Sequence, residues 1–378
     1  MKAVIAGYAR SPFQFAKKGA LATTRPDELA AQVVRGLLSR TNLDPGLIED
    51  VILGCSYPEG PQGNNMARIV GLLAGLPHTV AGTTVNRFCG SSMQAIHMAA
   101  ANIEAGMGDA FLCVGVESMT MVPQGGLNPS PNQQLKATSH AYISMGETAE
   151  NVAARWSVSR QEQDAFAVHS HTKAATARAE GRLHDEIVPI HTPEGVLVTE
   201  DGCIRPGTSL EALANLKPAF RPDGGVVTAG TSSPLTDGAV AVLVTSDTFA
   251  ERHHLNATAR ILSFAVAGVD PEIMGIGPIP ATRKALARAS LDASKLGVVE
   301  INEAFASQAI ACIRDLGLDP ARTNLDGGGI AIGHPLGATG ARITAKAAAL
   351  LQREQRRYAL ATQCIGGGQG IATILERV

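Results

Sequence analysis

The sequence predicts an α/β protein made of two similar layered halves with an insert between them. Short apolar strands alternate with amphipathic helices over residues 1–116, and the same alternation resumes after residue 239. Between them lies a stretch rich in Gly, Pro and charge. Strands that alternate with helices pack as layers around a sheet. The 378 residues, 45% of them hydrophobic, suffice for two or three domains or for two fused halves.

The first half begins with a buried strand at 2–7 and a polar turn at 8–12. A helix over 26–40 places its large aliphatic residues on one face and Pro26 in its first turn, where proline is favoured. The further elements expected in this half are a strand at 51–55, a helix at 67–73, a strand at 83–85, a helix at 95–106 and a strand at 110–115.

The insert combines a Gly/Pro-rich loop at 123–131 with helices at 148–155 and 160–178 and a strand that begins at 186–190. Its long loops suit a lid or binding element better than an independent core. The second half is expected to contain strands at 239–244, 259–264, 298–301, 358–362 and 371–375 and helices at 280–289, 303–315 and 344–352. Its layout echoes that of the first, which favours two α/β halves packed face to face.

Composition narrows the function classes. A net charge of -2 and a pI near 6.6 give no bias toward polyanions, so no nucleic-acid partner is expected. No apolar run reaches the length of a membrane span, and residues 1–7 resemble a first strand rather than a signal peptide. The six cysteines show no CxxC spacing, which argues against a disulfide framework and a zinc site. A soluble, cytoplasmic protein is expected.

Cys89 lies where a short strand gives way to a helix rich in small residues. The free N–H groups and the positive end of the helix dipole favour negative charge there, so a thiolate at this position should have a lowered pKa. Such a cysteine is a candidate nucleophile. A buried structural cysteine remains the alternative, because free Cys is among the most buried residue types.

A glycine-rich stretch at 324–340 holds a single histidine, His334, between Gly333 and Pro335. A histidine on such a rigid loop can take a proton from a thiol and stabilise the charge that forms. A phosphate-binding loop is the alternative, but the stretch has neither a GxGxxG after a strand nor a GK[ST] ending.

Two further positions complete the set. Cys364 follows a buried strand and precedes a glycine-rich turn, so it suits proton transfer at carbon, and the N–H groups of that turn could hold an oxyanion. Asn302 and Glu303 stand before a helix, where they act either as an ordinary cap or in a polar site. Two thiols, one His and one Asn suit covalent acyl transfer combined with carbanion chemistry.

Along its whole length the chain resembles the thiolase family. The motifs that carry the resemblance are NRFCGSS at 86–92, MGETAEN at 145–151, VTAGTSS at 227–233, NEAF at 302–305, GHP at 333–335 and CIG at 364–366. Details near Arg87, Ser92 and the C-terminus look most like the members found in bacterial fatty-acid oxidation complexes. The resemblance implies a 3-ketoacyl-CoA thiolase that works through an acyl-cysteine intermediate.

The resemblance implies a role for each matching position. Cys89 would be the acylated nucleophile, His334 its activating base and Cys364 the acid/base at the substrate α-carbon. Asn302 would position a water that helps His334 to stabilise the enolate oxygen. The N–H groups of Cys89 and Gly366 would form an oxyanion site. Ser233 matches the position that contacts the pantetheine part of coenzyme A.

The fold implied by the resemblance is a five-layered sandwich. Its N-terminal half would span 1–118, completed by 237–257, its loop domain 119–236 and its C-terminal half 258–378. Coenzyme A would be a co-substrate, with no permanently bound cofactor and no metal. The implied partners are acyl-CoA and CoA, a second copy in a homodimer or dimer of dimers, and a hydratase/dehydrogenase subunit of a β-oxidation complex.

The alternatives differ in substrate and in class. Ser144 stands where short-chain biosynthetic thiolases usually carry His, and Ser92 replaces their common Gly, which weakens the case for acetoacetyl-CoA as sole substrate. A ketoacyl synthase would need paired histidines and would lack the counterpart of Cys364. A non-catalytic thiolase-like lipid carrier would be expected to have lost Cys89 or His334. For longer acyl chains, a slot in the loop domain is expected to be lined by Met121, Val122, Leu127 and Met145.

Overall fold

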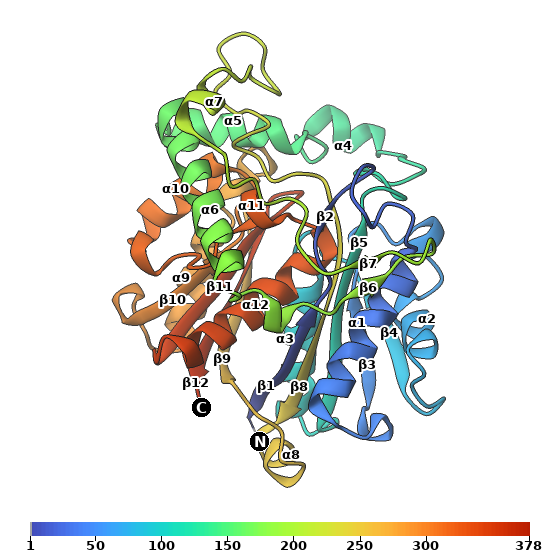
Figure 1. The fold of residues 1–378 in the computed structure, drawn as a ribbon. Coiled ribbons are helices and arrows are strands. Elements are labelled where there is room, and N and C mark those ends of the chain that lie inside the picture. Colours follow the sequence, from blue (N-terminus) through green and yellow to red (C-terminus); the bar gives the residue numbers. More distant parts are fainter. Residues whose placement is uncertain (1) are drawn as a thin grey trace.

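The computed structural model describes residues 2–378 and confirms a mixed α/β fold (Figure 1). The first half contains β1 (Ala3–Arg10), β2 (Gln14–Phe15), α1 (Pro26–Thr41), β3 (Asp50–Gly54), α2 (Met66–Leu73), β4 (Ala81–Val85), α3 (Ser91–Glu104) and β5 (Ala110–Ser118). The insert contains α4 (Gln133–Thr138), α5 (Met145–Arg155), α6 (Arg160–Ala179), β6 (Ile190–His191), β7 (Leu197–Val198) and α7 (Leu210–Ala214).

The remaining chain completes the first half and builds the second. Its elements are β8 (Thr236–Ser246), α8 (Asp247–Arg252), β9 (Ala259–Gly268), α9 (Pro278–Arg288), β10 (Leu296–Ile301), α10 (Ala306–Leu316), α11 (Gly329–Ile332), α12 (Leu336–Arg353), β11 (Tyr358–Ile365) and β12 (Gln369–Arg377). None of the helices in residues 2–378 is long and apolar enough to cross a bilayer.

The strands repeat one pairing pattern. The sheet order is β10-β11-β12-β9-β1-β8-β5-β3-β4. In the first half β3 pairs parallel to β5, and β5, β8 and β1 then pair antiparallel. In the second half β10 pairs parallel to β11, and β11, β12 and β9 then pair antiparallel. The two sets meet at β1 and β9, so they form one continuous ladder with the same topology on both sides.

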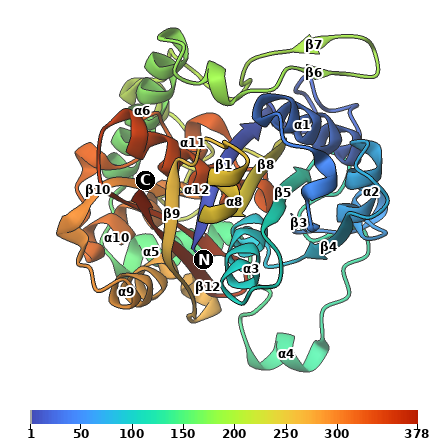
Figure 2. The same cartoon turned by 90° about the horizontal axis from the view of Figure 1, so that it is seen from below.

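Five layers follow from where the helices pack. Helices α1 and α2 cover the outer side of the first set of strands, and α9 and α10 cover the outer side of the second (Figure 2). Helices α3 and α12 lie between the sets, and α12 contacts strands of both. Their close approach needs Gly340, because a Cβ there would come within 2.6 Å of the Met93 backbone nitrogen. The main apolar core surrounds these two helices.

The insert packs chiefly on the second half. Helix α5 contacts α10, and α6 contacts both α10 and α11. In Figure 1, α4, α5 and α7 lie above the strands, at the end where β5 leads into the insert. The insert therefore covers the edge at which β5 and β8 connect to it.

Three local expectations are wrong. Tyr8 to Arg10 continue β1 instead of turning, because the buried Arg10 guanidinium is paired with Glu186 and Asp201 from the insert. The strand expected at 186–190 is reduced to β6, and His184–Glu186 form a 3₁₀ turn. Helix α12 begins at residue 336 rather than 344, since its glycine-rich first turns are helical.

Candidate active site

Cys89 lies in a tight turn between β4 and α3. Phe88 has φ of 42°, a left-handed conformation that is uncommon for an aromatic residue and is a mark of local strain. The turn is held by Ser91, whose hydroxyl accepts the Arg87 N–H at 2.9 Å and donates to the Phe88 carbonyl at 2.6 Å. The Arg87 side chain in turn donates to Gln369 in β12 at 2.9 Å. The cysteine is thus fixed at the helix start and against the second half.

His334 stands between α11 and α12, at the structural counterpart of the Cys89 position. Its Nδ1 lies 2.6 Å from the Thr339 hydroxyl, which donates its own hydrogen to the Pro335 carbonyl at 3.1 Å. The hydroxyl oxygen must therefore accept a hydrogen bond from Nδ1. Nδ1 then carries the imidazole proton, and Nε2 keeps its lone pair. Burial, and then the nearby Arg342 charge, lowers the pKa of His334 to about 3, which makes the imidazole neutral at physiological pH.

Asn302 follows β10 and points at His334. Its Nδ2 lies 3.3 Å from His334 Nε2, and its N–H bonds to the Thr362 carbonyl of β11 at 3.0 Å. The helix-cap interpretation is wrong, because α10 begins later and its N-cap is Phe305. Asn302 Oδ1 is buried and bonds to no other group in residues 2–378. The amide therefore has its nitrogen on the histidine, while its oxygen lies against Gly329, where a Cβ would come within 2.7 Å of it.

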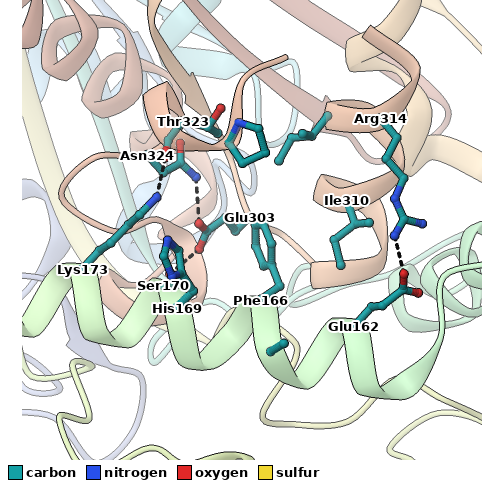
Figure 3. A pocket seen from close by; sticks show the side chains of 13 residues that line it. Glu162, Phe166, His169, Ser170, Lys173, Glu303, Ile310, Arg314, Thr323 and Asn324 are labelled. Carbon is teal, nitrogen blue, oxygen red and sulfur yellow. Dashed lines mark hydrogen bonds and ion pairs between the residues drawn. The ribbon is translucent and has the colours of Figure 1, made fainter. Parts of the chain in front are cut away.

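Glu303 turns the opposite way from Asn302. Its carboxylate accepts from Ser170 Oγ at 2.6 Å, Asn324 Nδ2 at 2.8 Å and the Ile330 N–H at 3.2 Å. It forms part of the wall of a cavity of about 370 Å³ between α6 and α10 (Figure 3). Among the residues to which the resemblance assigns a role, none lines that cavity. The role of Glu303 is to anchor the loop that carries Asn302.

Cys364 and Gly366 come from the end of β11 and the turn that follows it. Cys364 is buried, and its pKa is raised well above its usual range, first by burial and then by the effect of Cys89. The Gly366 N–H is directed at the Cys89 sulfur, and the Gln363 amide donates to the Cys89 carbonyl. The structure thus brings Cys89, Cys364 and Gly366 together.

The expected lowering of the Cys89 pKa is wrong for the resting protein. Burial raises its pKa to about 11, although the N–H groups of Gly366 and of Cys89 itself act in the opposite direction. Desolvation of the charged form outweighs the helix start because the thiol lies inside the junction of the two halves. Cys89 is therefore a protonated thiol at neutral pH, and a neutral base nearby is required to activate it.

Alkylation by iodoacetamide should follow from this environment. Cys89 is half-buried while the other five cysteines are buried, so Cys89 should react first. Because its pKa lies near 11, the thiolate fraction and the alkylation rate should rise about tenfold for each pH unit between roughly 7 and 10. Peptide mapping across this range provides the measurement. Earlier labelling of Cys203 or Cys312, with activity intact, would contradict the assignment.

Ser233 reaches the same region through its backbone. Its N–H donates to the carbonyl of Ala304 at 3.0 Å, two residues after Asn302, and its side chain is half-buried. The adjacent Ser232 forms a bridge with Phe305. Cys89 and Gly366 therefore lie together, and Asn302 and His334 form a second pair, which adjoins β11 because the Asn302 N–H bonds to Thr362, two residues before Cys364.

Two positioning groups were missed by sequence reasoning. Thr339, which fixes the tautomer of His334, lies within the glycine-rich stretch but gave no separate signal. Glu117 ends the apolar strand β5 and accepts from Ser56 N at 2.8 Å, Gln62 Nε2 at 2.9 Å and Gly337 N at 2.9 Å in the first turn of α12. The sequence signal that could have identified Glu117 is that it is the only charged residue in the apolar strand β5.

Comparison with known proteins supplies a family context for this geometry. The model described as "Thiolase, N-terminal domain" matches residues 3–248, and "Thiolase, C-terminal domain" matches residues 255–377. Proteins named 3-ketoacyl-CoA thiolase are similar over their full length. That of Bacillus subtilis (strain 168) is 47% identical, with 99% of each chain covered, and that of Shewanella sp. (strain MR-7) is 49% identical, with 100% of each covered. That of Saccharophagus degradans is 48% identical, covering 99% of this chain and 98% of its own.

Proposed function

The chain belongs to the thiolase family, and from this premise we propose that it is an acyltransferase that cleaves 3-ketoacyl-CoA with free coenzyme A. The products are acetyl-CoA and an acyl-CoA shortened by two carbons. The observation that supports the proposal is the set of a protonated thiol, a neutral histidine whose Nε2 keeps its lone pair and a second buried thiol.

The proposed reaction has two halves. His334 takes the Cys89 proton, and the thiolate adds to the 3-keto carbonyl. The C2–C3 bond then breaks, which leaves an acyl group on Cys89 and an enolate of acetyl-CoA that Cys364 protonates at carbon. In the second half Cys364 takes the thiol proton of coenzyme A, whose sulfur attacks the acyl-cysteine. The shortened acyl-CoA leaves, and the Cys89 thiolate recovers its proton from His334.

The charge that develops on oxygen is proposed to be held at two places. The N–H groups of Cys89 and Gly366 face the acylated sulfur and can donate to the thioester oxygen as it becomes negative. Asn302 and His334 form the second place, for the enolate oxygen, with a water positioned by Asn302. Ser233 is proposed to contact the pantetheine arm of coenzyme A, because its loop borders the one that carries Asn302.

The division of the chain is part of the proposal. Residues 1–118 with 237–257 form one half and 258–378 the other, which agrees with the repeated strand pairing. The loop domain at 119–236 is proposed to cover coenzyme A as a co-substrate, with no permanent cofactor. Its contacts with α10 through α5 and with α10 and α11 through α6 fit a cover over the junction.

The proposed assembly is a homodimer, or a dimer of such dimers. Strand β4 ends the sheet, pairs only with β3 and has an exposed or half-exposed side chain at each position, so its free edge can pair with a second copy. A hydratase/dehydrogenase subunit is proposed as a further partner, in line with the resemblance to β-oxidation thiolases. All six cysteines are free thiols, which supports a cytoplasmic location.

Chain length provides the test of substrate class. Met145 packs beside Gly366 and the apolar group around Cys364, whereas Val122 is fully buried and Leu127 is exposed. An acyl slot near Met145 would add about 0.8 kcal/mol of binding for each buried CH₂. We therefore expect kcat/KM for thiolysis to rise from acetoacetyl-CoA to 3-ketooctanoyl-CoA and 3-ketohexadecanoyl-CoA.

The alternatives predict different outcomes of that assay. A strong preference for acetoacetyl-CoA would move the protein to the short-chain thiolases and leave the catalytic residues as assigned. Binding of acyl-CoA without thiolysis at any chain length would identify a lipid carrier. Decarboxylation without dependence on free coenzyme A would identify a ketoacyl synthase.

A further inference from the structure

Two matching rows of polar side chains face one another where α12 packs on β10. Thr339, Arg342 and Lys346 follow one face of α12 at helical spacing, and Glu300 and Asn302 share one face of the strand and its extension. Asn302 meets His334, which is held by Thr339. Arg342 lies one helical turn after Thr339 on α12, and Glu300 lies two residues before Asn302. Arg342 Nη2 is 3.4 Å from Glu300 Oε2. The ion pair therefore joins the two elements that carry the base and its amide partner.

This ion pair is a costly way to hold two elements together. Both side chains are fully buried. Arg342 Nε and Nη1 and Glu300 Oε1 bond to no other group in residues 2–378, so one contact at 3.4 Å carries the pairing. A buried ion pair with incomplete hydrogen bonding is weak evidence for stability, because desolvation can exceed the attraction between the charges. Stability alone therefore does not explain the pair.

The pair also acts on the electrostatics of the site. Burial, and then the Arg342 charge, lowers the pKa of His334, and the same guanidinium is the partner of the Glu300 carboxylate. Glu300 itself has a pKa raised to about 7 by burial, while Arg342 and Lys346 lower it and Asp326 and Glu186 raise it. Tyr8 of β1 adjoins the same group. Loss of the Glu300 charge would leave the Arg342 cation, which disfavours the protonated form of His334, without the carboxylate that pairs with it.

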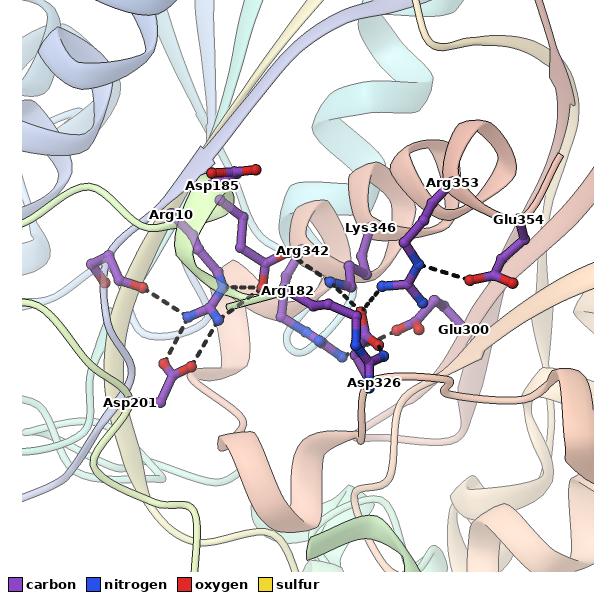
Figure 4. Close-up of polar contacts among 12 residues, drawn as sticks. Arg10, Arg182, Asp185, Asp201, Glu300, Asp326, Arg342, Lys346, Arg353 and Glu354 are labelled. Atoms are coloured by element: carbon purple, nitrogen blue, oxygen red, sulfur yellow. Dashed lines mark hydrogen bonds and ion pairs between the residues drawn. The ribbon is translucent and has the colours of Figure 1, made fainter. Parts of the chain in front are cut away.

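The surrounding network offers a matched comparison. Lys346 bonds to Glu186 at 3.0 Å and to Asp326 at 2.8 Å, and Glu186 also binds Arg10 (Figure 4). At the far end of this network Asp201 holds Arg10 through two bonds of 2.7 and 2.8 Å. Asp201 is a buried carboxylate on a buried guanidinium, like Glu300, but it touches neither α12 nor β10.

We propose that Glu300 and Arg342 are positioning residues, which set His334 against Asn302 and tune how readily His334 accepts the Cys89 proton. The inference rests on the proposed role of His334 as the base. It adds two residues that touch no substrate yet govern the rate of thiol activation.

The first test is Glu300→Gln, which keeps the shape of the side chain and removes its charge. The uncompensated Arg342 should weaken His334 as a base, so kcat for thiolysis and the rate of Cys89 alkylation at pH 8 should both fall about tenfold, as a pKa change of roughly one unit would give. KM should stay within about twofold of the wild-type value, because no substrate contact changes.

The second test is the double variant Glu300→Gln with Arg342→Met, in which no charge acts on His334 from this pair. Its alkylation rate should exceed that of Glu300→Gln and approach the wild-type rate. Replacing a buried ion pair by neutral groups is often tolerated, so this variant remains informative against the wild type even if the single variant does not fold. Asp201→Asn is the control, and its rates should stay within about twofold of wild type at temperatures below its Tm.

The outcomes separate the possible explanations. Equal rate losses in Glu300→Gln and Asp201→Asn, or alkylation and kcat unchanged in Glu300→Gln and in the double variant, would overturn the inference. If the wild-type protein showed no thiolysis, the proposed function would fail, but Cys89 alkylation would still report on the pair.

Discussion

Replacing Cys89 by serine is expected to abolish thiolysis, with kcat lower by a factor on the order of 10⁴ or more. The reason lies in the partner of His334. Its Nδ1 is held by the Thr339 hydroxyl rather than by a carboxylate, so the imidazolium that must form on proton transfer has no buried anion beside it. That arrangement can deprotonate a thiol but is poorly suited to a hydroxyl. Intact-protein mass after incubation with acetyl-CoA should show no acetyl group on the variant.

Cys312→Ser is the matched control. Cys312 is also fully buried, but it lies on α10 and its thiol donates to the Gly275 carbonyl at 3.3 Å, a bond that a hydroxyl can keep. Its kcat should stay within about threefold of wild type, because the replaced thiol has no part in the proposed reaction and its hydrogen bond is kept. An acetylated Cys89→Ser protein that turned over at a rate near that of Cys312→Ser would contradict the nucleophile assignment.

Cys364→Ser is expected to separate the two halves of the reaction. The variant should still acquire an acetyl group on Cys89, but exchange of the α-protons of acetyl-CoA should slow by about 10² to 10⁴. The Cys364 thiol is buried beside the turn that holds Gly366, and its role in the proposal is to move a proton to and from the α-carbon. A serine hydroxyl has a much higher pKa than a thiol, so it should not take over this proton transfer.

The measurement for Cys364→Ser is loss of the acetyl-CoA methyl signal in D₂O, followed by NMR, alongside the mass of the acetylated protein. Exchange at the wild-type rate would show that Cys364 is structural. Loss of acetylation together with exchange would point instead to a disturbed Cys89, for which the Gly366 N–H contact is the first place to look.

Most strands and helices could be predicted because their apolar periodicity is local. The errors in predicted secondary structure arise where contacts with residues far away in the sequence determine the local conformation. Arg10 reads as part of a turn, but the two carboxylates that permit it within a buried strand come from the insert, more than 170 residues later. The start of α12 was missed because Gly337 and Gly340 disfavour a helix locally, while close packing against Val116 and Met93 requires them.

The candidate site residues could be picked out from the sequence, but their electrostatics could not. Cys89, His334 and Cys364 stand out because each lies at a strand end or helix start beside glycine. The direction of the Cys89 pKa depends on how deeply the junction buries the sulfur, which no local pattern records. The tautomer of His334 likewise depends on a hydroxyl whose orientation is set by the Pro335 carbonyl. The pairing of Arg342 with Glu300 could not be inferred from the sequence, because it depends on the packing of α12 on β10.

The repeated strand pairing has a consequence for how this chain arose. Helices α3 and α12 occupy equivalent places in two copies of one strand–helix unit, yet one helix start carries a cysteine and the other a histidine. This is what duplication of an ancestral unit followed by divergence of the copies would produce. On the proposed roles, neither copy is a smaller version of the enzyme, because the proposed nucleophile lies in one copy and its proposed base in the other. Natural selection for the activity therefore constrains both copies at the same time, so neither can change its part of the site independently of the other.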